Sequence, residues 1–427
     1  MKRSTLALLG GPPVRKIPFA PHPVMGAEEK KEILSVLKTG LLSGFIANAG
    51  PAFLGGPKVR FLESLICRYF KMPYAVTMNS ATSALHAALS ALGIGPKDEV
   101  LVTPYTMSAS AAAILMQNAL PVFIDIDENT FCIDPKKMEE KIGPRTKAIM
   151  AVHLFGQPAP MDEIMKVAKK HDLAVVEDCA QSPGAVYHGR LAGTIGDIGV
   201  FSLNQHKTIT TGEGGFAMTY DKRLALRLQL VRNHGEVVSD HLKANFDIGP
   251  ILGWNYRMTE LEAAVGIAQF KKLDKLNRHR IRLAEYLIQE LSKVPGLSMP
   301  FRLPNTSHVY FLLPIRYDEN KTGLSREAFV KATAAEGVPL DAGYVRPIYW
   351  EPVYRNKKIY LNSSFPFGKN IHYKKGDCPA TERMYARELV TTNLCRYPLT
   401  ISDMRDIVKT FKKVLGLVKE IKRHFQK

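Results

Sequence analysis

Three residues of this chain, Asp178, Ser202 and Lys207, are of the types needed for chemistry on an amine. Asp178 ends the apolar run LAVVED, Ser202 ends GVFS, and Lys207 follows in HKTITTGEGG. A carboxylate at the end of a buried strand is costly unless it meets a cation or hydrogen-bond donors. A lysine amine attacks an aldehyde only after losing its proton, which favours partly desolvated surroundings. The ordinary alternatives are a helix cap for Asp178 and a solvated loop lysine.

A fourth feature, the segment MNSATSALHAAL, predicts a helix that starts with small and hydroxyl residues. The unpaired N–H groups and the dipole of such a helix start bind phosphate well, although a plain N-cap explains the sequence equally well. Gly212, Gly214 and Gly215 would let the backbone approach a cofactor closely. The chain has no GxxxxGK[ST] loop, and GTIGDIG does not match GxGxxG, so a nucleotide-binding motif is not indicated.

A phosphate seat, a carboxylate and an amine nucleophile together predict pyridoxal 5′-phosphate (PLP) as cofactor. Lys207 would be its covalent anchor and, once released, the proton carrier. Asp178 would keep the pyridine nitrogen of the cofactor protonated, so that the ring accepts electrons from a carbanion.

The elements that must position these residues alternate between short β-branched strands and amphipathic helices from about residue 74. This alternation predicts an α/β fold with a mostly parallel central sheet and helices on both faces. Ligands of such sheets bind outside the carboxyl ends of the strands, where Asp178 and Ser202 stand. A long helix near 273–293 would lead to a smaller C-terminal α+β domain. We expect an N-terminal arm (1–30), a large cofactor-binding domain (31–275) and the small domain (276–427).

The composition restricts the class of protein. The chain has 427 residues, and 58 Lys and Arg against 40 Asp and Glu give a net charge of +18. The basic runs have apolar residues at helical spacing, which is typical of solvated helix faces, so we expect no nucleic-acid partner. Five scattered cysteines without CxxC spacing argue against disulfides and a zinc site, and favour a reducing cytoplasm. No apolar run is long enough for a signal peptide or a membrane span.

The sequence resembles the DegT/DnrJ/EryC1/StrS family of PLP-dependent sugar aminotransferases over nearly its whole length. The matching segments include NSATSALHAALSALGIGPKDEV, PVFIDIDENTFCIDP, VVEDCAQSPGAVYHGRLAGTIGDIGVFSL, HKTITTGEGG, RNHG and GWNYRMTELEAAVG. The resemblance implies the type I PLP-dependent transferase fold of aspartate aminotransferase.

Carried over by position, the resemblance assigns the aldehyde-binding lysine to Lys207 and the partner of the pyridine nitrogen to Asp178. Gln181 would lie beside the cofactor ring. Relatives that act as dehydratases have histidine in place of the lysine. His206 precedes Lys207, but the register to TTGEGG puts the lysine in the catalytic position, which argues for amino transfer.

The phosphate would be held by Ser202 and the backbone of Ala81 and Thr82. Asn255 in GWNYRM matches a residue that reaches the phosphate from the other subunit, so the resemblance implies a homodimer with shared sites.

The sequence departs from the family pattern at Met107, where many members have an aromatic ring that stacks on the cofactor. A thioether also packs on an aromatic ring, Tyr105 is another candidate for stacking, and Met107 is equally well explained as a core residue. We expect His234, Tyr344 and Arg346 to be substrate contacts, with ordinary loop structure as the alternative.

The resemblance implies transfer of an amino group from glutamate or glutamine to a keto sugar. The acceptor would be a nucleotide-linked keto sugar or a keto-cyclitol such as an inosose, and the opening LALLGGPPVR is similar to the branch acting on cyclitols and antibiotic-type sugars. The alternatives are a PLP-dependent sugar dehydratase and a PLP-binding regulator that has lost turnover.

Overall fold

The computed structural model describes residues 5–23, 25–238, 249, 251–368 and 371–425. Its largest sheet has seven strands in the order β1-β9-β8-β5-β4-β2-β3. These strands are β1 (Tyr74–Met78), β2 (Glu99–Val102), β3 (Leu120–Phe123), β4 (Thr146–Val152), β5 (Ala174–Asp178), β8 (Ile198–Ser202) and β9 (Gly215–Thr219).

Strand direction in this sheet is mostly parallel. The pairs β3–β2, β2–β4, β4–β5 and β5–β8 are parallel, while β9 runs antiparallel to both β8 and β1. Asp178 and Ser202 are the last residues of the neighbouring strands β5 and β8, so both lie at the carboxyl edge of the sheet. The predicted α/β architecture is therefore confirmed, and this edge is where its ligands bind.

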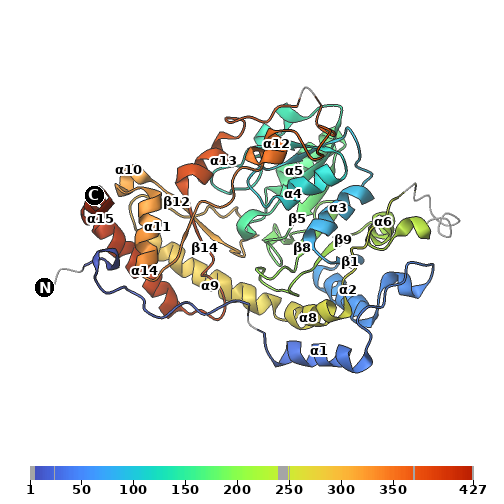
Figure 1. Ribbon diagram of the computed structural model, residues 1–427, viewed down its shortest axis with the longest axis horizontal. Helices are drawn as coiled ribbons and strands as arrows, with labels where there is room; N and C mark the ends of the chain where they lie inside the picture. The colour runs from blue at the N-terminus through green and yellow to red at the C-terminus, as the bar shows by residue number, and fades with distance from the viewer. Residues whose placement is uncertain (1–4, 24, 239–248, 250, 369–370, 426–427) are drawn as a thin grey trace.

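Helices cover the large sheet, and their sequences explain how closely they pack (Figure 1). Nine of the eleven residues of α3 are buried, because alanine and other small side chains let it lie deep in the fold. By contrast, α5 buries only one stripe and keeps its lysines in solvent. The helices of this part are α1 (Ala27–Thr39), α2 (Pro57–Phe70), α3 (Ala81–Ala91), α4 (Ala109–Met116), α5 (Met161–His171), α6 (Lys222–Arg232) and α8 (Glu260–Phe270).

A second, antiparallel sheet lies towards the C-terminus, in the order β10-β12-β14-β13. Figure 1 shows α9 running as one long helix from α8, at the large sheet, to this smaller part. The elements are α9 (Leu273–Leu291), β10 (Leu297–Ser298), β12 (Leu313–Tyr317), α10 (Glu319–Thr322), α11 (Arg326–Ala335), β13 (Asp341–Ala342), α12 (Pro352–Arg355), α13 (Pro379–Arg383), β14 (Leu389–Thr392), α14 (Ile401–Gly416) and α15 (Val418–Phe425).

Three short strands, β6 (Val186–Tyr187), β7 (Arg190–Leu191) and β11 (Thr306–Ser307), form a third sheet that joins the two parts. The N-terminal segment crosses to the small part, where the buried carboxylate of Glu336 accepts hydrogen bonds from the N–H of Ala7 (2.8 Å) and of Val14 (2.9 Å). Because α9 continues through the expected boundary at 275, the domain limits stay a prediction. In the described ranges, no helix has the length and apolar character needed to cross a membrane.

Candidate active site

Asp178 is buried at the carboxyl end of β5 and is held by two donors. The hydroxyl of Ser110 donates to Oδ2 at 2.7 Å, and the N–H of Ala180 donates to Oδ1 at 3.1 Å. A carboxylate has room for about four hydrogen bonds, so Asp178 keeps capacity for a further donor. Ser110 lies in the first turn of α4, in a run of small residues that gave no sign of this role at the sequence level.

Lys207 stands in the loop after β8, with its amine 4.6 Å from the centroid of the Phe311 ring. Burial lowers the pKa of the Lys207 ammonium from 10.5 to about 8, while the negative charge of Asp178 acts in the opposite direction. The preceding residue, His206, is exposed. Of these two side chains, Lys207 is thus the partly desolvated one.

The predicted phosphate seat combines the start of α3 with the edge of β8 and β9. Ser80 is the N-cap of α3, and its hydroxyl accepts from the N–H of Ser83 at 3.0 Å. Ser202 pairs with Gly215 on β9. A Cβ atom added to Gly215 would lie 2.5 Å from the backbone nitrogen of Ala81. The missing side chain therefore keeps β9 and the helix start close together, and this cradle fits the phosphate of the predicted cofactor.

Gln181 has both ends of its amide fixed. Its Oε1 accepts from the N–H of Phe155 at 2.7 Å, and its Nε2 donates to the Tyr344 hydroxyl at 2.8 Å. The Tyr344 ring packs edge-on against Phe155, at 5.0 Å between centroids, and against Tyr105, at 5.9 Å. Burial raises the pKa of Tyr344 to about 12, so its hydroxyl keeps its proton at neutral pH. Tyr344, expected only as a substrate contact, is thus joined directly to Gln181.

The two candidates for stacking on a cofactor lie in different surroundings. Tyr105 is completely buried and offers no exposed ring face. Met107 is 58% exposed just before α4, so the interpretation as a core methionine is wrong for this residue. Of the two candidates, only Met107 therefore has an exposed side chain, whose thioether can pack on an aromatic ring.

The structure does not bring the remaining predicted residues into hydrogen-bond or ion-pair contact with Lys207 or Asp178 within the described part of the chain. The guanidinium of Arg346 is exposed and forms an ion pair with Glu351. The imidazole of His234 lies 3.7 Å from a carboxylate oxygen of Glu236. Asn255 is exposed and forms an isolated antiparallel bridge with Asn233. Thr82 is half-buried in the first turn of α3.

A buried group beside the site, His153, Glu177 and Cys179, has ligand atoms within 4.8 Å of one another, as metal sites do. Hydrogen bonds account for the first two. Nδ1 of His153 accepts from the N–H of Ala159 at 2.8 Å, so Nε2 carries the proton and donates to Glu177 at 2.9 Å. Glu177 also accepts from the N–H groups of Gly193, Ile195 and Gly196. Burial raises the pKa of Glu177, but these donors more than offset it and lower the pKa overall. The carboxylate fixes the GTIGDIG segment.

Comparison with known proteins identifies the family. The DegT/DnrJ/EryC1/StrS aminotransferase family matches residues 30–392. The chain belongs to this family. It is 34% identical to the L-glutamine:2-deoxy-scyllo-inosose aminotransferase of Streptomyces kanamyceticus over 431 residues, which cover 97% of this chain and 98% of the relative. It is 40% identical to the GDP-perosamine synthase of Caulobacter vibrioides over 279 residues, 65% of this chain and 73% of the relative.

Among solved structures, the aminotransferase from Psychrobacter cryohalolentis matches with a TM-score of 0.82 and 30% identity, over 94% of this chain and all of that one. Family members and their structural neighbours are PLP-dependent enzymes with the type I fold. The predicted fold, enzyme class and cofactor are therefore confirmed: the protein is a PLP-dependent sugar aminotransferase.

Proposed function

We propose that this aminotransferase moves an amino group to a keto-cyclitol or related keto sugar through Lys207, the covalent anchor of PLP. The observation that carries this assignment is the position of Lys207 in the loop after β8, at the sheet edge where Asp178 ends β5; burial there lowers the pKa of its amine to about 8. When bound, PLP supplies an electron sink for the carbon that loses its proton. Lys207 holds and returns that proton, because its amine is released when the donor amine takes its place.

The other residues of the site bind and orient the cofactor. Asp178, which accepts a hydrogen bond from Ser110, would hold the pyridine N–H of the cofactor, and Gln181 would lie beside the ring. Ser202 and the N–H groups of Ala81 and Thr82 would hold the phosphate at the start of α3. Met107 would contact the ring through its exposed thioether.

We also propose which keto sugar accepts the amino group and which amino acid donates it. The similarity to the inosose aminotransferase extends over 97% of this chain, whereas the similarity to the perosamine synthase covers 65%. This difference favours a keto-cyclitol acceptor and, from the relative's name, L-glutamine as the amino donor. Of the three proposed substrate contacts, Tyr344 is best supported, because its hydroxyl accepts a hydrogen bond directly from Gln181. His234 and Arg346 stay proposed contacts, without a hydrogen bond or ion pair to Lys207 or Asp178 in the described residues.

We further propose a homodimer in which Asn255 reaches the cofactor phosphate of the partner subunit, since its side chain is exposed on the single chain. All five cysteines are free, which supports a reducing cytoplasm as its location. Small molecules are the proposed partners, with no part for nucleic acid or a membrane.

The first test is the visible spectrum of the PLP-loaded protein before and after addition of L-glutamine or L-glutamate. We expect the wild type and the matched variant His206→Ala to show the band of lysine-bound PLP and to lose it with the donor. Lys207→Ala should not form that band. A band that survives in Lys207→Ala but disappears in His206→Ala would overturn the assignment of the anchor.

Product analysis tests the acceptor and the dehydratase alternative. The donor-treated enzyme is offered scyllo-inosose or a nucleotide-linked keto sugar, and the products are weighed by mass spectrometry. Amino transfer replaces the carbonyl oxygen by an amine, whereas a dehydratase removes water without adding nitrogen. Turnover of only the nucleotide-linked compound would contradict the cyclitol proposal.

A further inference from the structure

A separate cavity of about 660 Å³ lies behind the loop that carries Lys207. Its wall is built by the N-terminal segment around His22, by α1, by the junction of α8 and α9, and by Tyr397. Thr208, the residue after the catalytic lysine, also lines it. A volume of this size is typical of small-molecule sites. The sequence gave no sign of this cavity, because its residues come from four distant segments.

Two polar groups in the wall have no hydrogen-bond partner within the described part of the chain. Thr208 is 1% exposed, and its hydroxyl makes no hydrogen bond to these residues. Nδ1 of His22 is likewise buried and without a partner, while Nε2 lies 3.2 Å from the carbonyl oxygen of Lys207. A carbonyl only accepts, so Nε2 carries the proton. Burial, helped by the charge of Arg280, lowers the pKa of His22, whereas the backbone carbonyl groups of Lys207 and Tyr397 act in the opposite direction.

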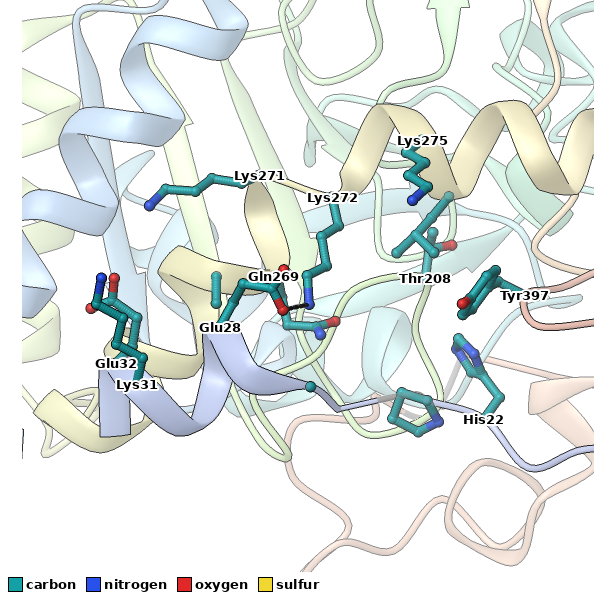
Figure 2. Close-up of a pocket in the computed structure, with 14 residues that line it drawn as sticks. His22, Glu28, Lys31, Glu32, Thr208, Gln269, Lys271, Lys272, Lys275 and Tyr397 are labelled. Carbon is teal, nitrogen blue, oxygen red and sulfur yellow. Dashed lines mark hydrogen bonds and ion pairs between the residues drawn. The ribbon is translucent and has the colours of Figure 1, made fainter. Parts of the chain in front are cut away.

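The charges around the cavity are mainly positive. Lys272 forms ion pairs with Glu28 (3.2 Å) and Glu29 (2.7 Å). Glu32 forms an ion pair with Lys58 at 2.7 Å. Within the described ranges, Lys31, Lys271 and Lys275 have no carboxylate at ion-pair distance. Figure 2 shows the amine of Lys275 directed towards Thr208, with His22 and Tyr397 on the same side of the cavity. The positive charges of Arg280 and Arg396 also act on His22.

We propose that this cavity is a second ligand site, distinct from the cofactor site, which binds a small hydroxylated anion of the sugar-phosphate class. The Thr208 hydroxyl, which has no partner among the described residues, would pair with a hydroxyl group of the ligand. Lys275 supplies an unpaired charge for the phosphate. A single molecule can bind both the Thr208 hydroxyl and the Lys275 amine if it carries a hydroxyl group and an anionic group.

Isothermal titration of the PLP-loaded enzyme with D-glucose 6-phosphate tests the proposal. We expect saturable binding, with one site per chain, that is at least tenfold tighter than binding of either D-glucose or inorganic phosphate. The enzyme is loaded with one PLP per chain and free PLP is removed before the titration, because PLP is itself a hydroxylated phosphate ester and would compete for the second site. No saturable binding, or equal binding of inorganic phosphate alone, would overturn the inference.

Two variants locate the site. Thr208→Val removes a hydroxyl that has no partner while keeping the shape of the side chain, and Lys275→Met removes the charge. Each is expected to weaken sugar-phosphate binding about tenfold with the band of lysine-bound PLP unchanged. The control Lys419→Met removes an exposed lysine of α15 and should bind like the wild type. If all three variants bind equally well, the ligand lies elsewhere and the inference fails.

Discussion

At the scale of the residue, the least expected feature of the site is the contact between Ser110 and Asp178. Both side chains are buried, and the 2.7 Å hydrogen bond leaves the carboxylate one defined orientation. A hydrogen bond to a charged group is worth about 1.5–3 kcal/mol, and its loss leaves a buried lone pair without a donor. Ser110 acts through Asp178, and is thus a positioning residue.

Ser110→Ala should slow the reaction of the PLP-loaded enzyme with L-glutamine by roughly tenfold or more, since 1.4 kcal/mol corresponds to a factor of ten. Stopped-flow absorption measures this rate directly. The pH dependence of the absorption band of lysine-bound PLP should also change, which a purely structural role would not produce. Ser110→Thr keeps the hydroxyl and is expected to restore both the rate and the pH dependence of the band. The positioning role is contradicted if Ser110→Thr stays slow and the band of Ser110→Ala keeps its wild-type pH dependence.

The lowered pKa of Lys207 makes a second prediction at this scale. Since the uncharged amine is the nucleophile, the rate at which the cofactor-free protein captures PLP should rise with pH and level off around a midpoint near pH 8. An unperturbed lysine, with a pKa of about 10.4, would still be rising beyond pH 9. Stopped-flow mixing with PLP at different pH values gives the midpoint. A midpoint above pH 9.5 would show that burial does not govern this amine.

At the scale of the element, the approach of β9 to the start of α3 decides the shape of the phosphate seat. Gly215→Ala adds a Cβ 2.5 Å from the nitrogen of Ala81 and 2.8 Å from the carbonyl oxygen of Phe201. Both neighbours are backbone atoms, which cannot rotate away. Strand and helix must therefore move apart, and the N–H groups of the helix start move with them.

We expect Gly215→Ala to destabilise the protein by about 1–3 kcal/mol, as overpacked substitutions do, and to weaken PLP binding. Urea unfolding and a fluorescence titration with PLP measure the two effects. The control is Gly416→Ala at the end of α14, where an added Cβ meets nothing within 4 Å. Wild-type PLP affinity in Gly215→Ala would contradict the proposed seat.

At the scale of the whole molecule, the proposed shared site makes activity depend on two chains. Lys207→Ala and Asn255→Ala should each be inactive alone, but mixed dimers should contain one site with both residues intact. When equal amounts of the two variants reassort at random, about half of the dimers are mixed, and each mixed dimer has one intact site out of two. The expected activity is therefore about a quarter of that of the wild type. Activity is measured after the two variants are unfolded together and refolded. No recovery, despite normal dimers by light scattering, would mean that Asn255 serves its own chain.

The sequence by itself determined the alternation of strands and helices, because apolar periodicity is a local property. It also determined which residues end β5 and β8, so Asp178 and Ser202 were placed at the correct edge of the sheet. The proposal that Lys207 anchors the cofactor comes from the register of HKTITTGEGG in the family resemblance, and the structure leaves His206 exposed.

Only the tertiary structure decided which side chains support those residues. Ser110 and Asp178 are 68 positions apart, and Gln181 and Tyr344 are 163 apart. No local pattern marks such pairs, since the hydrogen bond exists only once two elements have packed. The same reason explains the exposure of Met107, the burial of Tyr105 and the cavity behind Lys207, where four distant segments meet. Chemistry that depends on residue type was readable from the chain, whereas positioning depends on packing and was not.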